Sequence, residues 1–136
     1  MANLLVTNKE DYKVVTTNCD IDKNSVIHYI CCKQSSSPTE HTITLDINYY
    51  IIDVLASEIN HSFTPNCKVV GDCLISICKI KKGEEITRNY YDTEEIILKQ
   101  FVDRESGELI NTKNLYLYKN GEEELDFNEY VDIEID

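Results

Sequence analysis

The sequence predicts a β-rich α+β fold of short strands with two short helices. Short runs of β-branched and apolar residues recur along the chain, and such runs are typical of strands. Polar segments rich in Asn, Asp and Ser separate these runs, as expected of turns. One segment instead spaces its apolar residues close to the helical period, and another begins with a helix-capping residue. A length of 136 residues predicts one domain with one core, and no internal repeat is present.

Most of the predicted strands lie in the first 91 residues. Single strands are predicted at Val14–Thr17, Val26–Cys32, His41–Leu45 and Ile86–Tyr91. The segment Cys67–Ile80 predicts a hairpin, because Gly71-Asp72 between two apolar runs favours a two-residue turn with positive φ. Further along the chain, a second hairpin is predicted around Asn120-Gly121, with strands at Leu115–Tyr118 and Leu125–Phe127.

Two helices are predicted between these strands. Residues Asn48–Ile59 carry apolar side chains at a spacing closer to 3.6 than to 2. Thr93 is a typical N-cap, and Glu94 and Glu95 would lie in the first turn of a helix that ends near Phe101. The expected structural core is therefore residues 12–101, followed by an acidic C-terminal segment, residues 102–136.

Charge and composition restrict the classes of partner. The formal net charge is −12, and residues 92–136 contain 4 Lys or Arg against 14 Asp or Glu. Such a surface argues against nucleic acid and against anionic membranes, and it would attract a basic partner such as a lysine-rich tail. Solubility is the alternative role of the charge. No apolar run approaches the roughly 20 residues of a membrane span, and no signal-peptide pattern opens the chain, so a cytoplasmic or nuclear location is expected.

The cysteines are predicted to be reduced and structural. The six are Cys19, Cys31, Cys32, Cys67, Cys73 and Cys78. No Cys-x-x-Cys pair occurs, and the chain has three histidines, so no metal site is expected. Without a secretory signal, buried thiols are favoured over disulfides.

Three segments carry the motifs that point to a function. They are Asp20–Ile27 (DIDKNSVI), Asn60–Cys67 (NHSFTPNC) and Ile80–Tyr90 (IKKGEEITRNY). In this order, the blocks resemble the D-I-x-K-G-x-x-I, Asn-His-Ser-x-x-Pro-Asn and I-x-x-G-E-E-I-T-x-x-Y signatures of the SET-domain family. The resemblance covers about residues 12–92. Asn24 replaces a glycine of the first signature, and asparagine tolerates the left-handed conformation needed there.

The resemblance implies a fold, a cofactor and a reaction. The fold would be SET-like, with a pseudoknot where the Asn60 and Tyr90 segments cross. The cofactor would be S-adenosylmethionine, held by Asn60 and by the backbone of His61. Tyr90 would be the catalytic residue, and Phe63 and Tyr91 would line the substrate channel. The reaction would be methyl transfer to the ε-amine of a lysine in a basic, histone-like protein or peptide.

The chain departs from the family pattern at one functionally important point. The family opens with a Gly-x-Gly loop that approaches the cofactor, and here the corresponding positions lie near Tyr12, Lys13 and Val14. A side chain at such a position would hinder close backbone approach. No Cys-x-Cys cluster follows Tyr90, so the zinc cluster found after some SET domains is not expected. Two hypotheses follow: a lysine methyltransferase, and a catalytically inactive SET-like binding module.

Overall fold

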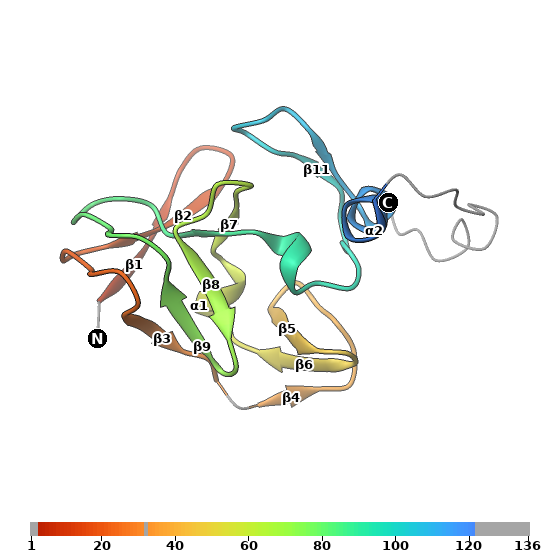
Figure 1. The fold of residues 1–136 in the computed structure, drawn as a ribbon, viewed down its shortest axis with the longest axis horizontal. Coiled ribbons are helices and arrows are strands. Elements are labelled where there is room, and N and C mark those ends of the chain that lie inside the picture. The colour runs from red at the N-terminus through yellow and green to blue at the C-terminus, as the bar shows by residue number, and fades with distance from the viewer. Residues whose placement is uncertain (1–2, 32, 122–136) are drawn as a thin grey trace.

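The computed structural model describes residues 3–31 and 33–121, which form small sheets joined by short helical turns (Figure 1). The strands are β1 (Leu4–Asn8), β2 (Lys13–Thr17), β3 (Val26–Tyr29), β4 (Gln34–Ser35), β5 (Thr42–Asp46), β6 (Tyr49–Ile52), β7 (Asn60–His61), β8 (Cys67–Val70), β9 (Cys73–Ser76), β10 (Thr87–Arg88), β11 (Phe101–Val102) and β12 (Leu109–Ile110). The helical elements are α1 (Val54–Ser57), the 3₁₀ turn η1 (Tyr90–Asp92) and α2 (Thr112–Asn120). The predicted β-rich α+β class with short helices is confirmed. Among the described residues, no helix is long and apolar enough to cross a membrane.

The sheets are small and close around a shared apolar core. β1 pairs with β2, β11 pairs with β12, and two three-stranded sheets have the orders β3-β9-β8 and β4-β6-β5, all antiparallel. Ile27, Ile51 and Leu74, from three of these strands, are fully buried in one cluster. A second cluster contains Tyr91, Ile97, Ile110 and Leu115, so it packs η1 against β12 and α2. Burial of branched apolar side chains stabilises both clusters.

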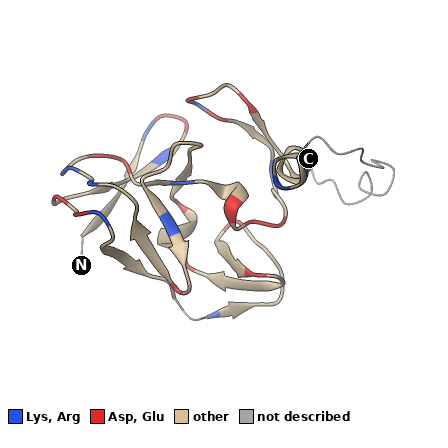
Figure 2. Ribbon diagram, viewed as in Figure 1, with Lys and Arg blue, Asp and Glu red and all other residues tan. Residues whose placement is uncertain are grey.

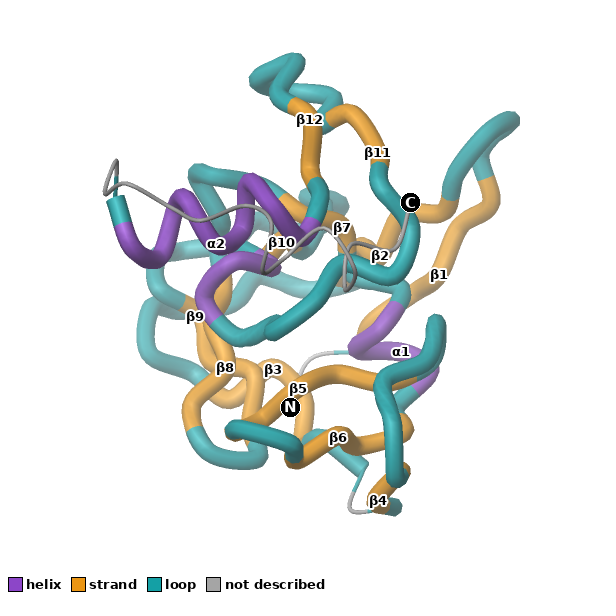
Figure 3. Tube along the Cα trace, turned by 90° about the vertical axis from the view of Figure 1, so that its right-hand side faces the viewer, coloured by secondary structure: helices purple, strands orange, loops and turns teal. Residues whose placement is uncertain are grey.

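The parallel pair of β7 and β10 joins two segments that are distant in the sequence (Figure 3). Asn60 lies opposite Thr87, and the Ser62 N–H donates a hydrogen bond to the Arg88 carbonyl at 2.9 Å. The Asn66 side chain completes the junction, because its amide donates to the Glu85 carbonyl at 2.7 Å and accepts from the Thr87 N–H at 2.9 Å. The contact between residues 60–66 and 86–91 that the SET resemblance implies is therefore present.

The predicted helix Asn48–Ile59 is wrong over most of its length. Residues Tyr49–Ile52 form β6, and only the single turn α1 is helical. Asn48 adopts a φ of 57°, which turns the chain from β5 into β6. The β-branched and aromatic side chains of β6 fit a buried strand better than a helix. Asp53 then caps α1. The apolar residues that suggested one helix therefore belong to two elements, β6 and α1.

The predicted helix from Thr93 to Phe101 is also wrong. The helical turn lies earlier, at η1, where the Asn89 side chain accepts from the Tyr91 N–H. The predicted strand Ile86–Tyr91 is accordingly reduced to β10. Glu94 does not support a helix N-terminus, because its carboxylate accepts from the Thr44 hydroxyl at 3.0 Å. Tertiary hydrogen bonds therefore replace the local capping that the sequence pattern favours.

The predicted strand Leu115–Tyr118 lies inside α2. The Asn111 side chain caps this helix by accepting from the Asn114 N–H at 2.8 Å, and Leu115 is buried on the inner face. Gly121 follows with a φ of 70°, so the Asn120-Gly121 pair ends a helix instead of turning a hairpin. The partner strand Leu125–Phe127 lies outside the described residues.

The cysteines described by the structure are free thiols. Cys67 is buried, and its Sγ donates to the Thr87 carbonyl at 3.1 Å. Burial raises the pKa of this thiol to about 12, so it remains a neutral packing group. Cys31 and Cys78 are exposed, so the prediction of buried thiols is wrong for these two.

Asp53 holds α1 against β3. Its carboxylate accepts from the Ala56 N–H at 2.8 Å, from the Cys31 N–H at 2.7 Å and from the His28 ring at 2.8 Å. Burial alone would raise the pKa of Asp53, but these hydrogen bonds outweigh burial and lower it below its ordinary value of 3.8. The folded state therefore binds this proton less tightly than the unfolded state. The resulting stability is fully present above pH 3.8 and is lost as the pH falls through the lower folded pKa.

We expect Asp53→Asn to lower the free energy of unfolding by about 2 kcal/mol at pH 7. The substitution removes a charged acceptor, and the NH₂ group of asparagine would lie against a backbone N–H that needs an acceptor. Urea unfolding at pH 7 and at about pH 3 measures the effect, and the difference from the wild type should shrink at the lower pH as Asp53 takes up its proton. Asp46→Asn, an exposed aspartate of β5, is the control. A pH-independent difference would show that the charge of Asp53 does not contribute.

Candidate functional site

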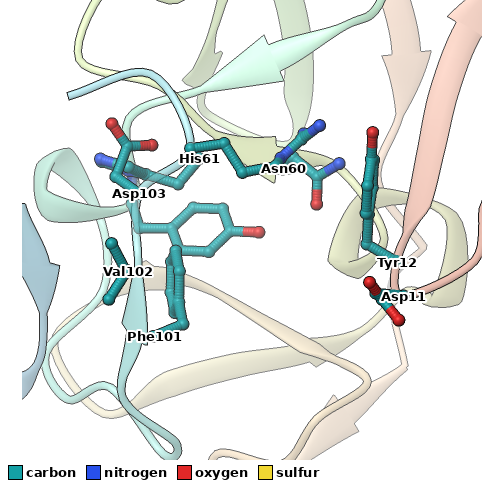
Figure 4. Close-up of a pocket in the computed structure, with 9 residues that line it drawn as sticks. Asp11, Tyr12, Asn60, His61, Phe101, Val102 and Asp103 are labelled. Atoms are coloured by element: carbon teal, nitrogen blue, oxygen red, sulfur yellow. The ribbon is translucent and has the colours of Figure 1, made fainter. Parts of the chain in front are cut away.

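A large cavity, with a volume of about 540 Å³, lies between the β1–β2 turn, β7, η1 and β11 (Figure 4). Its lining residues are Asp11, Tyr12, Asn60, His61, Tyr90, Phe101, Val102, Asp103 and Arg104. Three of the residues singled out in the sequence, Asn60, His61 and Tyr90, therefore meet in one cavity. They come together because β7 and β10 are paired and η1 follows β10 directly.

Asn60 is fixed by hydrogen bonds on two sides. Its Nδ2 donates to the Lys13 carbonyl at 2.7 Å and to the Glu85 carboxylate at 2.8 Å. The Asn60 side chain therefore links β7 to β2 and to Glu85, which lies just before β10. Its Oδ1 accepts no hydrogen bond within the part of the chain that the structure describes. Asn60 thus offers an oriented acceptor at the cavity wall.

His61 is a buried, neutral histidine with a defined tautomer. Its Nδ1 accepts from the Tyr90 N–H at 3.0 Å, so the ring proton lies on Nε2. Burial, with a smaller contribution from Arg88, lowers the pKa of His61 against the opposing effect of Asp103. Within residues 3–31 and 33–121, no group accepts from Nε2. An unpaired buried donor is costly, so Nε2 is an unsatisfied polar atom next to the cavity that His61 lines.

Tyr90 directs its hydroxyl at a backbone carbonyl. The hydroxyl donates a hydrogen bond to the Ile59 carbonyl oxygen, just before β7. Burial raises the pKa of Tyr90 above its ordinary value, and Arg88 opposes this effect. The phenol is therefore protonated at neutral pH. Its ring packs on His61 and Phe101, with centroids 5.3 and 5.9 Å apart.

Arg88 and Glu94 form a buried ion pair behind Tyr90. The guanidinium lies 4.5 Å from the Tyr90 ring centroid, and Nη1 lies 3.3 Å from Glu94 Oε2. The exposed fractions of the two side chains are 5% and 13%. Because Glu94 also accepts from Thr44, the pair connects Tyr90 to β5. Sequence reasoning missed this pair, because the polar neighbours Thr87 and Asn89 give no sign that Arg88 is buried.

A second cavity, of about 200 Å³, also has Tyr90 in its lining. Tyr90 and Phe101 line both cavities, so their rings form a shared wall. The remaining walls come from the loop before β5 and from the segment between η1 and β11, including Glu40, Glu94 and Leu98. Two compartments of different size therefore meet at the Tyr90 ring.

Phe63 and Tyr91 lie elsewhere. They line a third cavity of about 410 Å³ together with Leu117 and Tyr118 of α2. The Phe63 and Tyr91 ring centroids are 5.5 Å apart, and Tyr91 is 5.2 Å from Tyr118. Neither residue lines the two cavities that share Tyr90. Their role in a substrate channel stays a prediction.

The β1–β2 turn closes without glycine. The Lys9 N–H donates to the Tyr12 carbonyl at 2.7 Å, and none of the described residues of this turn has a positive φ. The Tyr12 ring instead forms a wall of the large cavity, where the Arg104 guanidinium stacks on it at 4.0 Å. Arg104 also lies 3.3 Å from the Glu85 carboxylate. No pattern in the sequence indicates that the β11–β12 turn meets this hairpin.

The motif arrangement agrees with a comparison against protein families. The family model described as "SET domain" matches residues 5–91. The chain belongs to the SET-domain family. The match includes the β1–β2 hairpin, both partners of the β7–β10 pair and the first two residues of η1. In keeping with the sequence-based expectation for the opening turn of this domain, Asn24 has a φ of 65°.

Solved structures show the same fold. The crystal structure of KRYPTONITE in complex with mCHG DNA and SAH matches this SET domain with a TM-score of 0.57 and 20% identity over 75% of the present chain. A second KRYPTONITE structure, with mCHH DNA, an H3(1-15) peptide and SAH, matches with a TM-score of 0.56 and 19% identity over 76% of the chain. The matched region spans 27% of each KRYPTONITE chain. A search of the curated proteins finds no match.

Proposed function

We propose that this SET domain transfers a methyl group from S-adenosylmethionine to the ε-amine of a lysine in a basic protein or peptide. The observation that carries the proposal is the position of Tyr90. Its hydroxyl is held by the Ile59 carbonyl, and the residue lines both a large cavity and a smaller one. Two reactants of different size can thus bind next to one oriented tyrosine.

The residues of the large cavity fit the cofactor. The volume of 540 Å³ falls within the range of about 300–1,000 Å³ that small-molecule sites occupy. The Oδ1 of Asn60 supplies an acceptor, the backbone of His61 lies beside it, and Tyr12 and Phe101 supply aromatic faces. When bound, the cofactor supplies a methyl group already activated by its sulfonium. Asn60 and His61 are the residues that would hold it.

Tyr90 and Ile59 supply orientation and electrostatic stabilisation. Because the phenol is neutral and directed by the Ile59 carbonyl, both oxygens occupy fixed positions before the reactants bind. Such preorganised dipoles stabilise a transition state without reorganising during the reaction. The aromatic rings of Tyr90 and Phe101 also exclude water, and an apolar channel favours the neutral, nucleophilic form of a lysine amine. Alignment of the reactants then lowers the barrier further.

The smaller cavity fits a side chain in size. Its volume of about 200 Å³ is too small for a nucleotide-sized ligand, and its lining balances Glu40 and Glu94 against Arg88 and Lys99. Acidic residues gather at η1 and in the segment that follows it (Figure 2). These charges favour a basic, lysine-containing substrate of the histone-tail type. That the partner is not nucleic acid remains a prediction; both KRYPTONITE structures contain DNA.

S-adenosylmethionine should raise the melting temperature of the wild-type protein, since a ligand at about 100 times its Kd stabilises the folded state by about 2.7 kcal/mol. Asn60→Ala should abolish the shift, because it removes the oriented acceptor and the bonds to Lys13 and Glu85. Asn18→Ala is the matched control, because Asn18 is exposed and lies outside the cavity. A wild-type protein without any shift at millimolar cofactor would contradict cofactor binding.

Mass spectrometry of a lysine-rich peptide incubated with the protein and cofactor tests the transfer step. The expected product carries methyl groups on lysine nitrogen, and the Asn60→Ala variant should yield none. Cofactor binding without any methylated product from peptides or basic proteins would instead support an inactive binding module.

A further inference from the structure

The large cavity has an unbalanced set of charges. Asp11 and Asp103 line it from two turns that face each other across the opening, as Figure 4 shows. Arg104 is the one cation among the described residues that line this cavity. His61 adds no charge, because burial lowers its pKa.

The charge of Arg104 is already compensated. Its Nη2 lies 3.3 Å from the Glu85 carboxylate, and its guanidinium stacks on Tyr12 at 4.0 Å. Glu85 in turn accepts from Asn60, which holds this carboxylate beside the cavity. The arginine therefore offsets Glu85 first and leaves the two aspartates of the cavity uncompensated.

Neither aspartate has an ionic partner among the described residues. Asp103 is buried, and its carboxylate accepts from the N–H and the hydroxyl of Ser106 at 3.0 and 2.7 Å, both of which are neutral donors. Asp11 is exposed at the rim and forms no ion pair in the described part of the chain. With the aromatic faces of Tyr12 and Phe101, these carboxylates make the cavity favourable to a cation.

We propose that Asp11 and Asp103 make the large cavity select the cationic cofactor over its neutral product, S-adenosylhomocysteine. This inference rests on the proposed function. In the transfer, the lysine nitrogen forms a C–N bond with its lone pair, and the C–S bond breaks with its electron pair remaining on sulfur. The proton of the amine is released to solvent. The sulfonium thus becomes a neutral thioether, and the ligand loses one positive charge.

Charge is the property by which the two ligands differ most. The adenosine and amino-acid groups are common to both, so Asn60 and His61 would bind each with similar strength. Specificity is a difference of affinities, and here the difference would arise from the two carboxylates in the lining of the cavity. The consequence is release of the product after each turnover.

Isothermal titration calorimetry with S-adenosylmethionine and S-adenosylhomocysteine tests the inference. We expect the wild type to bind the sulfonium about tenfold more tightly, and the ratio of the two Kd values to fall to about twofold in Asp11→Asn/Asp103→Asn. Asparagine retains the acceptor oxygen for Ser106, so the turn should persist. Glu10→Gln/Glu105→Gln, which also removes two charges from the same two turns but at exposed residues that do not line the cavity, is the control.

The outcomes separate this inference from the proposed function. An unchanged ratio in the double variant, with both ligands still bound, would overturn charge selection and leave the methyltransferase proposal standing. Failure of the wild type to bind either ligand would overturn both. Should the double variant not fold, Asp11→Asn alone must lower the ratio, because Asp11 is exposed and bonds no other element. The wild-type ratio must also fall as salt rises, since screening acts within about 8 Å at 0.15 M.

Discussion

Replacing Tyr90 with phenylalanine is expected to lower the rate of methyl transfer about a hundredfold, the scale seen when one preorganised transition-state donor is deleted. The change removes one oxygen and almost no volume. It leaves the Ile59 carbonyl without its hydroxyl donor, so the free energy of unfolding should fall by about 1 kcal/mol. Cofactor affinity should change little, because Asn60 and His61 hold the cofactor in the proposed site.

Rates of lysine methylation and calorimetric Kd values measure the two effects separately. Mono-, di- and trimethyl products must be quantified individually, because loss of a channel hydroxyl can change product multiplicity. Tyr91→Phe is the matched control, since Tyr91 lines a different cavity. If Tyr90→Phe retains the full rate while Tyr91→Phe loses it, Tyr90 is a packing residue and Tyr91 becomes the catalytic candidate.

The sequence was informative where function restricts residue identity. Asn60, His61 and Tyr90 lie in recognisable blocks, and those blocks meet in the fold because β7 pairs with β10. Phe63 and Tyr91 are adjacent to these residues in the sequence but face α2. Position next to a motif therefore did not determine which cavity a side chain lines.

Long-range partners could not be predicted from local patterns. The stack of Arg104 on Tyr12 depends on how the β11–β12 turn approaches the β1–β2 turn, and no periodicity contains that information. Glu94 resembles a first-turn helix residue, yet tertiary hydrogen bonds to Thr44 and the ion pair with Arg88 determine its position. The predicted helices at Asn48–Ile59 and from Thr93 to Phe101 failed for a related reason. Short elements depend on tertiary packing more than on the intrinsic preference of their residues.

The Arg88–Glu94 pair supports Tyr90 from behind, so its removal should affect stability strongly. Glu94→Ala would leave the buried Arg88 guanidinium without an ionic partner, and breaking a buried pair in this way costs about 3–5 kcal/mol. The variant also removes the acceptor for the Thr44 hydroxyl and N–H on β5. Urea unfolding should therefore show a much lower midpoint, and the Tyr90 ring should lose its fixed cation–π contact.

Two further variants test whether the cost comes from the unpaired charge. Glu95→Ala removes the neighbouring carboxylate, which accepts from the Asn48 N–H at 2.7 Å, and should cost only about 1 kcal/mol. Arg88→Met/Glu94→Leu should regain much of the stability lost in Glu94→Ala, because apolar residues of similar volume can replace a buried ion pair at little net cost. If Glu94→Ala destabilises the protein no more than Glu95→Ala does, the guanidinium has found another partner. The ion pair would then not be what holds Tyr90 at the wall between the two cavities.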